Sequence, residues 1–117
     1  MKEIKDFQAE VKTWSEECFG EEIVADKKLR NHRFLEEALE LVQSLGCTCE
    51  EADRLVTYVF SRPKGAPLQE LGGTLVTLAT LSNANGFSME GAATKELENI
   101  WMNINKIREK SKNKPKF

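Results

Sequence analysis

The sequence predicts an all-α fold, a helical bundle of four to five helices. Apolar residues recur at helical spacing in separate stretches, turn-forming residues divide those stretches, and no stretch alternates as a half-exposed strand does. With 117 residues, 40% of them hydrophobic, the chain is long enough for one domain with its own core, which we expect over residues 1–110. Residues 111–117 are basic, contain Pro115 and lack periodicity, so we expect a mobile tail there.

The first expected helix runs from Lys2 to Phe19 and ends before Gly20. Its apolar side chains follow a three-four spacing and form one stripe: Ile4, Phe7, Val11, Trp14 and Cys18. Residues 21–30 are mostly charged, and we expect a loop or irregular turn. Asn31 is then a plausible N-cap for the second helix, which could also start several residues earlier. That helix has a wide apolar arc and ends at Gly46.

A capping box marks the start of the third expected helix. Thr48 stands at the N-cap and Glu51 three residues later, before an apolar stripe that runs to about Phe60. The composition of residues 61–67 is typical of a turn, and Pro67 fits the first turn of a fourth helix.

The fourth helix extends to Ala84 and is apolar nearly all round, which predicts a central position in the fold. Asn85 and Gly86 end it. Ser88 is a reasonable N-cap for the last helix, whose apolar stripe continues to about Lys110. The second and fourth helices have more apolar surface than one copy of the chain can cover, so we expect a homodimer or homotetramer.

Composition argues against several classes of protein. A net charge of −2 disfavours general electrostatic binding to nucleic acid. The three cysteines form no Cys-x-x-Cys pair and His32 is the only histidine, so neither a zinc site nor a disulfide framework is expected. There is no long apolar run and no apolar signal-peptide stretch. We expect a cytoplasmic protein with no nucleic-acid or membrane partner.

Three carboxylates fall within five residues of the second helix: Glu36, Glu37 and Glu40. Glu37 and Glu40 lie about 60° apart around a helix, with Arg33 between them one turn earlier. Two such carboxylates can share Mg²⁺, which prefers oxygen ligands and keeps waters that a phosphate can displace. The alternative is a solvated acidic face, which is common on amphipathic helices. Repulsion costs about a few tenths of a kcal/mol per pair, which favours a functional reason for the cluster.

Glu70 provides a carboxylate on the fourth helix. An acidic residue in a first turn has an ordinary explanation, because it complements the helix dipole. Yet Glu-x-x-Glu on one helix and Glu-Leu-Gly on the next, between apolar faces, is the layout of a carboxylate metal site inside a helical bundle.

The stretches "FLEEALELVQ" and "QELGGTLVTLATLSNANGFSMEGA" resemble the MazG-like all-α nucleoside triphosphate pyrophosphohydrolases, and "RNHRFLEEALEL" resembles their short phage-type branch. The resemblance covers about Trp14 to Arg108. It implies a house-cleaning hydrolase that converts a nucleoside or deoxynucleoside triphosphate to the monophosphate and pyrophosphate with Mg²⁺, or with Mn²⁺ in its place. It also implies a dimer or tetramer, the usual state in that family.

The resemblance implies a set of metal ligands as well. The family's first acidic pair corresponds to Glu37 and Glu40, and its third ligand corresponds to Glu70. Gly73 stands where the family has an Asp. Glu36 could supply a ligand only with a different geometry.

Five further residues are candidates for substrate binding: His32, Arg33, Asn103, Lys106 and Arg108. The last three correspond loosely to phosphate-binding residues on the family's last helix. His32 is either a surface or helix-start histidine or a phosphate or base contact. Arg33 either pairs with a neighbouring glutamate or binds phosphate. Trp14 and Trp101 fit apolar stripes, with base stacking as the alternative.

Two functions therefore compete. The first is the Mg²⁺-dependent pyrophosphohydrolase. The second is a non-catalytic helical module that binds nucleotide or protein and has lost the metal site through Gly73. The second predicts that any nucleotide binding is indifferent to Mg²⁺.

Overall fold

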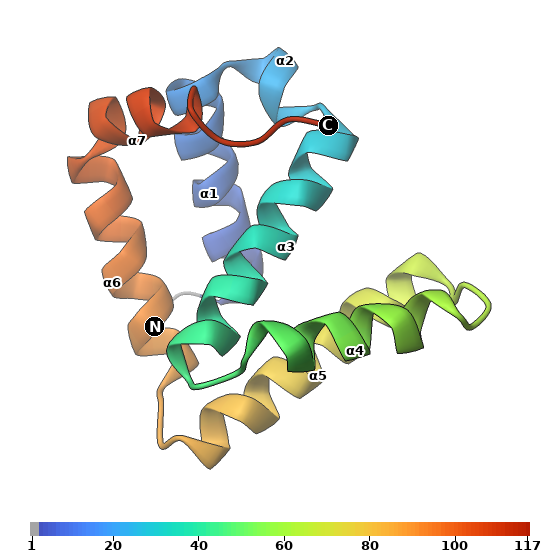
Figure 1. Cartoon of the computed structure of the whole chain (residues 1–117). Helices are drawn as coiled ribbons and strands as arrows, with labels where there is room; N and C mark the ends of the chain where they lie inside the picture. Colours follow the sequence, from blue (N-terminus) through green and yellow to red (C-terminus); the bar gives the residue numbers. More distant parts are fainter. Residues whose placement is uncertain (1–2) are drawn as a thin grey trace.

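Residues 3–117, the part of the chain that this computed structural model describes, form seven helices and no strand (Figure 1). The helices are α1 (Ile4–Phe19), α2 (Glu21–Val24), α3 (Lys27–Ser44), α4 (Cys49–Phe60), α5 (Pro67–Ala84), α6 (Met89–Met102) and α7 (Ile104–Ser111). The all-α prediction is confirmed, whereas the predicted number of helices, four to five, was too low. The expected start of the first helix, Lys2, lies outside the described residues. Across residues 3–117, no helix has the length and apolar content needed to span a membrane.

Helices α1 and α6 hold the buried apolar side chains of the described chain, and α7 packs beside them. Trp14, Cys18 and Leu97 are 8%, 2% and 5% exposed. The indole N–H of Trp14 donates to the carbonyl of Ile100 at 2.8 Å, which satisfies its polar edge. The thiol of Cys18 lies 3.7 Å from the carbonyl of Ile104. These contacts join the two ends of the chain and confirm that Trp14 and Cys18 are core residues.

The chain between α1 and α3 is more helical than expected. Gly20 ends α1 with a φ of 86°, a left-handed value that favours glycine. Helix α2 follows directly. Asp26 is the N-cap of α3, because its carboxylate accepts a hydrogen bond from the N–H of Leu29 at 3.1 Å. Asn31 is therefore not the N-cap, because Asp26 offers the same kind of acceptor more than one turn earlier, and the alternative of a start several residues earlier is confirmed.

The expected last helix is two helices, α6 and α7. Asn103 separates them with φ −115° and ψ 27°, outside the α-helical region. Its side-chain amide donates to the carbonyl of Asn99 at 2.8 Å, a local bond of the kind that competes with helix continuation. The apolar stripe continues across the break into Ile104 and Ile107, which is why the periodicity indicated one helix.

The other helix starts follow local signals in the sequence. Thr48 and Glu51 form both halves of the capping box, with N–H to side-chain oxygen distances of 2.8 and 3.2 Å. The hydrogen bond from the backbone N–H of Thr48, followed by the one from its hydroxyl, lowers the pKa of Glu51. Ser88 accepts from the N–H of Gly91 at 3.0 Å, and Pro67 opens α5. These boundaries were predicted correctly.

Helices α4 and α5 form a hairpin that projects from the rest of the molecule (Figure 1). We refer to residues 49–84 as the arm. Ser82 is its only buried residue, and Phe60, Leu68 and Val76 are 84%, 83% and 66% exposed. The central position expected for α5 was therefore wrong for a single copy, because an apolar helix needs a covering surface that its own chain does not supply.

Candidate active site

The acidic turn of α3, residues 36–40, combines one paired and two unpaired carboxylates. Glu37 and Glu40 are exposed, lie one helical turn apart, and have no ion-pair partner within the described chain. Glu36 is half-buried, and its carboxylate lies 3.1 Å from Nζ of Lys114 and 3.7 Å from Nη1 of Arg33. Arg33 thus pairs with a neighbouring glutamate, which was one of its two expected roles. Glu37 and Glu40 remain accessible to a cation from solution.

The C-terminal segment, residues 112–117, lies against α3 beside that turn. Nη1 of Arg33 donates to the carbonyl of Pro115 at 3.1 Å, and Lys114 bonds Glu36. The rings of His32 and Phe117 meet edge to face, with centroids 4.9 Å apart. The mobility expected of this tail stays a prediction, and motion would have to break these contacts.

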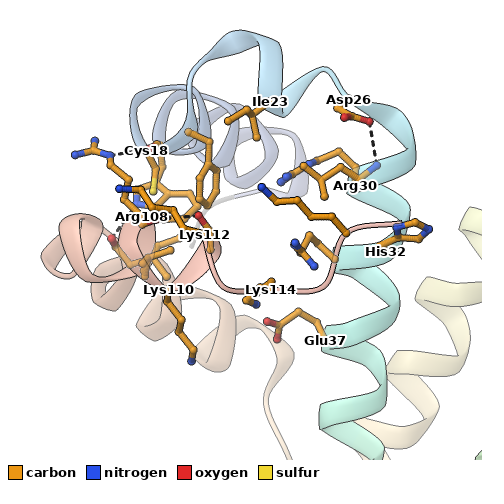
Figure 2. Close-up of a pocket in the computed structure, with 18 of the residues that line it drawn as sticks. Cys18, Ile23, Asp26, Arg30, His32, Glu37, Arg108, Lys110, Lys112 and Lys114 are labelled. Atoms are coloured by element: carbon orange, nitrogen blue, oxygen red, sulfur yellow. Dashed lines mark hydrogen bonds between the residues drawn. The ribbon is translucent and has the colours of Figure 1, made fainter.

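A cavity of about 900 Å³ lies between α1, α3, α7 and the tail, next to the acidic turn (Figure 2). Eight of its lining side chains are cationic: Lys28, Arg30, Arg33, Arg108, Lys110, Lys112, Lys114 and Lys116. Three are carboxylates: Asp26, Glu37 and Glu96. The excess of positive charge favours an anionic ligand, and the volume is typical of small-molecule pockets.

Arg30 enters this cavity from α3 with an unused donor. Its Nε is buried and has no hydrogen-bond partner within the described chain. Its guanidinium lies over the ring of Phe19, 5.6 Å from the centroid. Burial lowers the pKa of Arg30, the charge of Arg33 lowers it further, and Asp26 opposes both effects. An arginine remains charged at neutral pH, so this guanidinium can donate to a bound anion.

Arg108 has a structural role that the sequence did not reveal. Its Nε and Nη2 donate to the carbonyls of Cys18 and Glu17 at 2.8 and 3.0 Å. Its Nη1 donates to the side-chain oxygen of Asn105 at 3.0 Å. These bonds satisfy carbonyls in the last turn of α1. Because every guanidinium nitrogen has a protein partner, the geometry favours helix capping over phosphate binding.

The predicted substrate-binding residues divide into two groups. His32, Arg33 and Arg108 line the cavity. Asn103 separates α6 from α7, and Lys106 is exposed on α7; neither contributes to the cavity lining. The structure therefore brings together only part of the predicted set.

Glu70 lies in the first turn of α5, beside the connection to α4 at the far end of the arm (Figure 1). Its side chain lies against Gly65, where an added Cβ would collide with it. A Cβ at Gly73, in contrast, would meet nothing within 4 Å. Among residues 3–117, no group of three or more His, Cys, Asp or Glu side chains is placed to hold a metal ion. One copy therefore does not assemble Glu70 with Glu37 and Glu40 into a three-carboxylate site.

Arg30 and the lysines of the C-terminal segment are cavity residues that the sequence did not single out. The signal present was the basic composition of that segment, with six Lys or Arg between Lys106 and Lys116. Composition does not say which surface the segment covers, and the residues after Ser111 have no periodicity that would place them.

The chain matches no protein family, no curated protein and no solved structure. The MazG-like resemblance therefore stays a prediction that depends on two sequence motifs.

Proposed function

We propose that this protein is a Mg²⁺-dependent nucleotide pyrophosphohydrolase that cleaves a nucleoside or deoxynucleoside triphosphate to the monophosphate and pyrophosphate. The observation that carries the proposal is the cationic cavity with Glu37 in its wall. A triphosphate needs cations for its charged oxygens, and a metal ion bound to it needs carboxylates. The cavity and the acidic turn of α3 offer both kinds of group side by side.

Glu37 and Glu40 fit Mg²⁺ as a pair of ligands. Both carboxylates are exposed and without an ion-pair partner in the described chain. Mg²⁺ is usually held by one or two carboxylates together with substrate phosphates and waters, so two ligands of this kind can bind the ion. Glu36 fits less well, because Lys114 and Arg33 already neutralise it. When bound, the metal supplies charge neutralisation at the phosphates and lowers the pKa of a water molecule.

The cationic and aromatic residues of the cavity have separable roles in this proposal. Arg30 has a free donor for a non-bridging phosphate oxygen. Lys110 and Lys112 enter from the end of α7 and the tail, and would stabilise charge that develops on the pyrophosphate leaving group. The rings of His32 and Phe117 also line the cavity and offer apolar surface to a base.

A second candidate is a non-catalytic helical module that binds nucleotide through the same cavity. The separation of Glu70 from the acidic turn within one copy favours it, as does Gly73 at the position of a family carboxylate. In this case the cationic side chains alone would hold the ligand, and Mg²⁺ would not change its affinity.

Release of pyrophosphate from a panel of canonical and modified nucleoside triphosphates, with Mg²⁺ or Mn²⁺, tests the proposal. Glu37→Gln and Glu40→Gln should each lower turnover by about 10²–10³-fold, because each weakens binding of the metal ion that stabilises the transition state. Glu98→Gln changes an exposed glutamate on α6 that does not line the cavity, and it is the matched control, with turnover unchanged. No turnover of any triphosphate at high protein concentration would exclude the enzyme.

Gly73→Asp separates the two candidates. The open space at this position means that the new side chain does not disturb the packing of one copy. Gly72→Asp is the control, because a Cβ at that neighbouring glycine also meets nothing within 4 Å. If Gly73→Asp creates hydrolysis and Gly72→Asp does not, the native protein is the non-catalytic module that has lost its metal site. Loss of existing hydrolysis only in that variant identifies the glycine as part of a working site.

A further inference from the structure

We propose that the arm, residues 49–84, and the adjoining apolar face of α3 form the interface of a two-fold homodimer in which the two arms lie antiparallel. The occupant of this surface is a second copy of the chain.

Exposed apolar side chains occur along both helices of the arm and along α3. Leu68, Leu71 and Leu75 are exposed at helical spacing along one stripe of α5. Leu35 and Leu39 are exposed one turn apart on α3, the helix that leads into the arm. Apolar surface of this extent marks an interaction site.

The exposed area of the chain is large enough for a stable dimer contact. The chain exposes 9729 Å², whereas a compact monomer of 13.3 kDa exposes about 6,450 Å², which leaves an excess of about 3,300 Å². The radius of gyration is 15.6 Å, compared with about 13.4 Å for a compact domain of this length. Obligate homodimers bury about 2,000–5,000 Å² in total, so two copies have enough surplus surface.

The low charge of α5 and of the second half of α4 favours a second copy as the partner of this surface. Glu70 is the only charged residue of α5, and residues 55–60 of α4 include none. A surface with so few charges can pair with its own copy without burying unpaired ions. It offers no set of charges that would attract a strongly charged partner. A two-fold contact between identical surfaces is the commonest form of homodimer.

The antiparallel arrangement follows from the two ends of the arm. Phe60 and Leu68 flank the connection at its tip, whereas α3 joins its base through residues 45–48. Helix α4 has 12 residues and is about 18 Å long, so it holds the tip away from α3 of its own chain. In an antiparallel pair, the tip of each arm reaches the base of the other and covers Leu35 and Leu39 there. Parallel arms would place tip against tip and leave Leu35 and Leu39 uncovered by either tip.

Light scattering at micromolar concentration tests the assembly. The native protein should have twice the mass of one 13.3 kDa chain. Val76→Glu should give a single-chain mass, because it buries an unpaired charge in the contact. Ile4→Glu, at an exposed apolar residue of α1, is the control and should leave the dimer intact. A native mass of one chain, or a larger mass that Val76→Glu does not change, overturns the proposal.

Thiol cross-linking tests the arrangement independently of any variant that fails to fold. Lys64→Cys introduces a thiol at the tip, and the native Cys49 is exposed at the base. A short bismaleimide should join position 64 of one copy to Cys49 of the other, giving a two-chain band whose linked peptides mass spectrometry identifies. Adding Cys49→Ser should remove that link. Links only between equivalent positions of the two copies, or no link between chains, overturn the antiparallel arrangement.

Discussion

Helices α1 and α6 bury apolar side chains with α7 packed beside them, whereas α4 and α5 expose theirs. In the first region, Trp14 bonds the carbonyl of Ile100 and Arg108 bonds the carbonyls of Glu17 and Cys18, so its contacts connect opposite ends of the chain. The hydrogen bonds of the arm are local ones, such as the capping box at Thr48. Apolar periodicity therefore indicates that a helix face must be buried, but it does not indicate whether the same chain or another copy buries it.

The two regions also differ in charge. The cavity between α1, α3 and α7 collects eight Lys and Arg side chains, while α5 has Glu70 as its one charged residue. We therefore assign the phosphate contacts to this cavity, the metal contacts to the adjoining acidic turn of α3, and assembly to the arm.

The largest expected effect is recovery of hydrolysis when Glu37→Gln and Glu70→Gln proteins, each with strongly lowered turnover alone, are mixed. This prediction rests on both the proposed activity and the antiparallel dimer, in which Glu70 lies near α3 of the other copy. A mixed dimer then holds one complete set of carboxylates, so random exchange of chains should restore about a quarter of the native rate.

Mixing Glu37→Gln with Glu40→Gln is the control. Both changes lie on α3, so every site in that mixture lacks either Glu37 or Glu40, and hydrolysis should not recover. Native mass spectrometry would establish that the chains exchange. Exchange without recovered hydrolysis in the Glu37 and Glu70 mixture contradicts the shared site.

The next largest effect concerns stability. Trp14→Ala should lower the free energy of unfolding by about 3–5 kcal/mol, because it removes a buried indole and its bond to Ile100. Leu75→Ala on the arm should change it by only about 0.5 kcal/mol in dissociated chains. Denaturant titrations at several protein concentrations would show the Leu75 effect growing with concentration, because only the dimer buries that side chain. If Trp14→Ala and Leu75→Ala lower the free energy of unfolding equally in dilute protein, the distinction between the two regions is contradicted.

A smaller effect is expected at the tail. Lys114→Ala should weaken binding of inorganic triphosphate about tenfold, or about 1.4 kcal/mol, because it removes a cavity cation and releases the tail from Glu36. Lys95→Ala removes an exposed lysine of α6 that does not line the cavity, and should bind as the native protein does. Fluorescence or calorimetric titration measures both. The same loss in both variants would indicate a general charge effect.

The smallest effect concerns the cysteines. Burial raises the pKa of the Cys18 thiol, and the charge of Arg108 only partly offsets this. Cys49 is exposed and should react with a thiol reagent first, and Cys18 last. Because its folded pKa is raised, protonated Cys18 contributes stability below the ordinary thiol pKa, and this is lost as the pH rises through the folded value. Peptide mass spectrometry after timed labelling would measure the rates, and equal rates contradict the assigned burial.

Local signals made most helix boundaries predictable. Thr48, Pro67 and Ser88 act within one turn of their own backbone, so their identity and spacing were sufficient. The break at Asn103 was missed, because the apolar stripe has the same period on both sides of it.

The candidate site was predictable only where its residues share one helix. Glu37 and Glu40 lie one turn apart, as the helical spacing required. The cationic cavity depends on contacts such as Lys114 with Glu36, which are 78 residues apart. No local pattern encodes that distance. The position of Glu70 depends likewise on the direction of the arm.

Calorimetric titration with a non-hydrolysable nucleoside triphosphate analogue, with Mg²⁺ and with a chelator, tests the proposed site most directly. We expect one analogue per chain, bound about tenfold or more tightly when Mg²⁺ is present. Glu37→Gln and Glu40→Gln should abolish the gain from Mg²⁺ and keep the weaker metal-free binding, because the cavity cations are unchanged. Equal affinity with and without Mg²⁺ would contradict the claim that the acidic turn of α3 and the cationic cavity form one metal-dependent site.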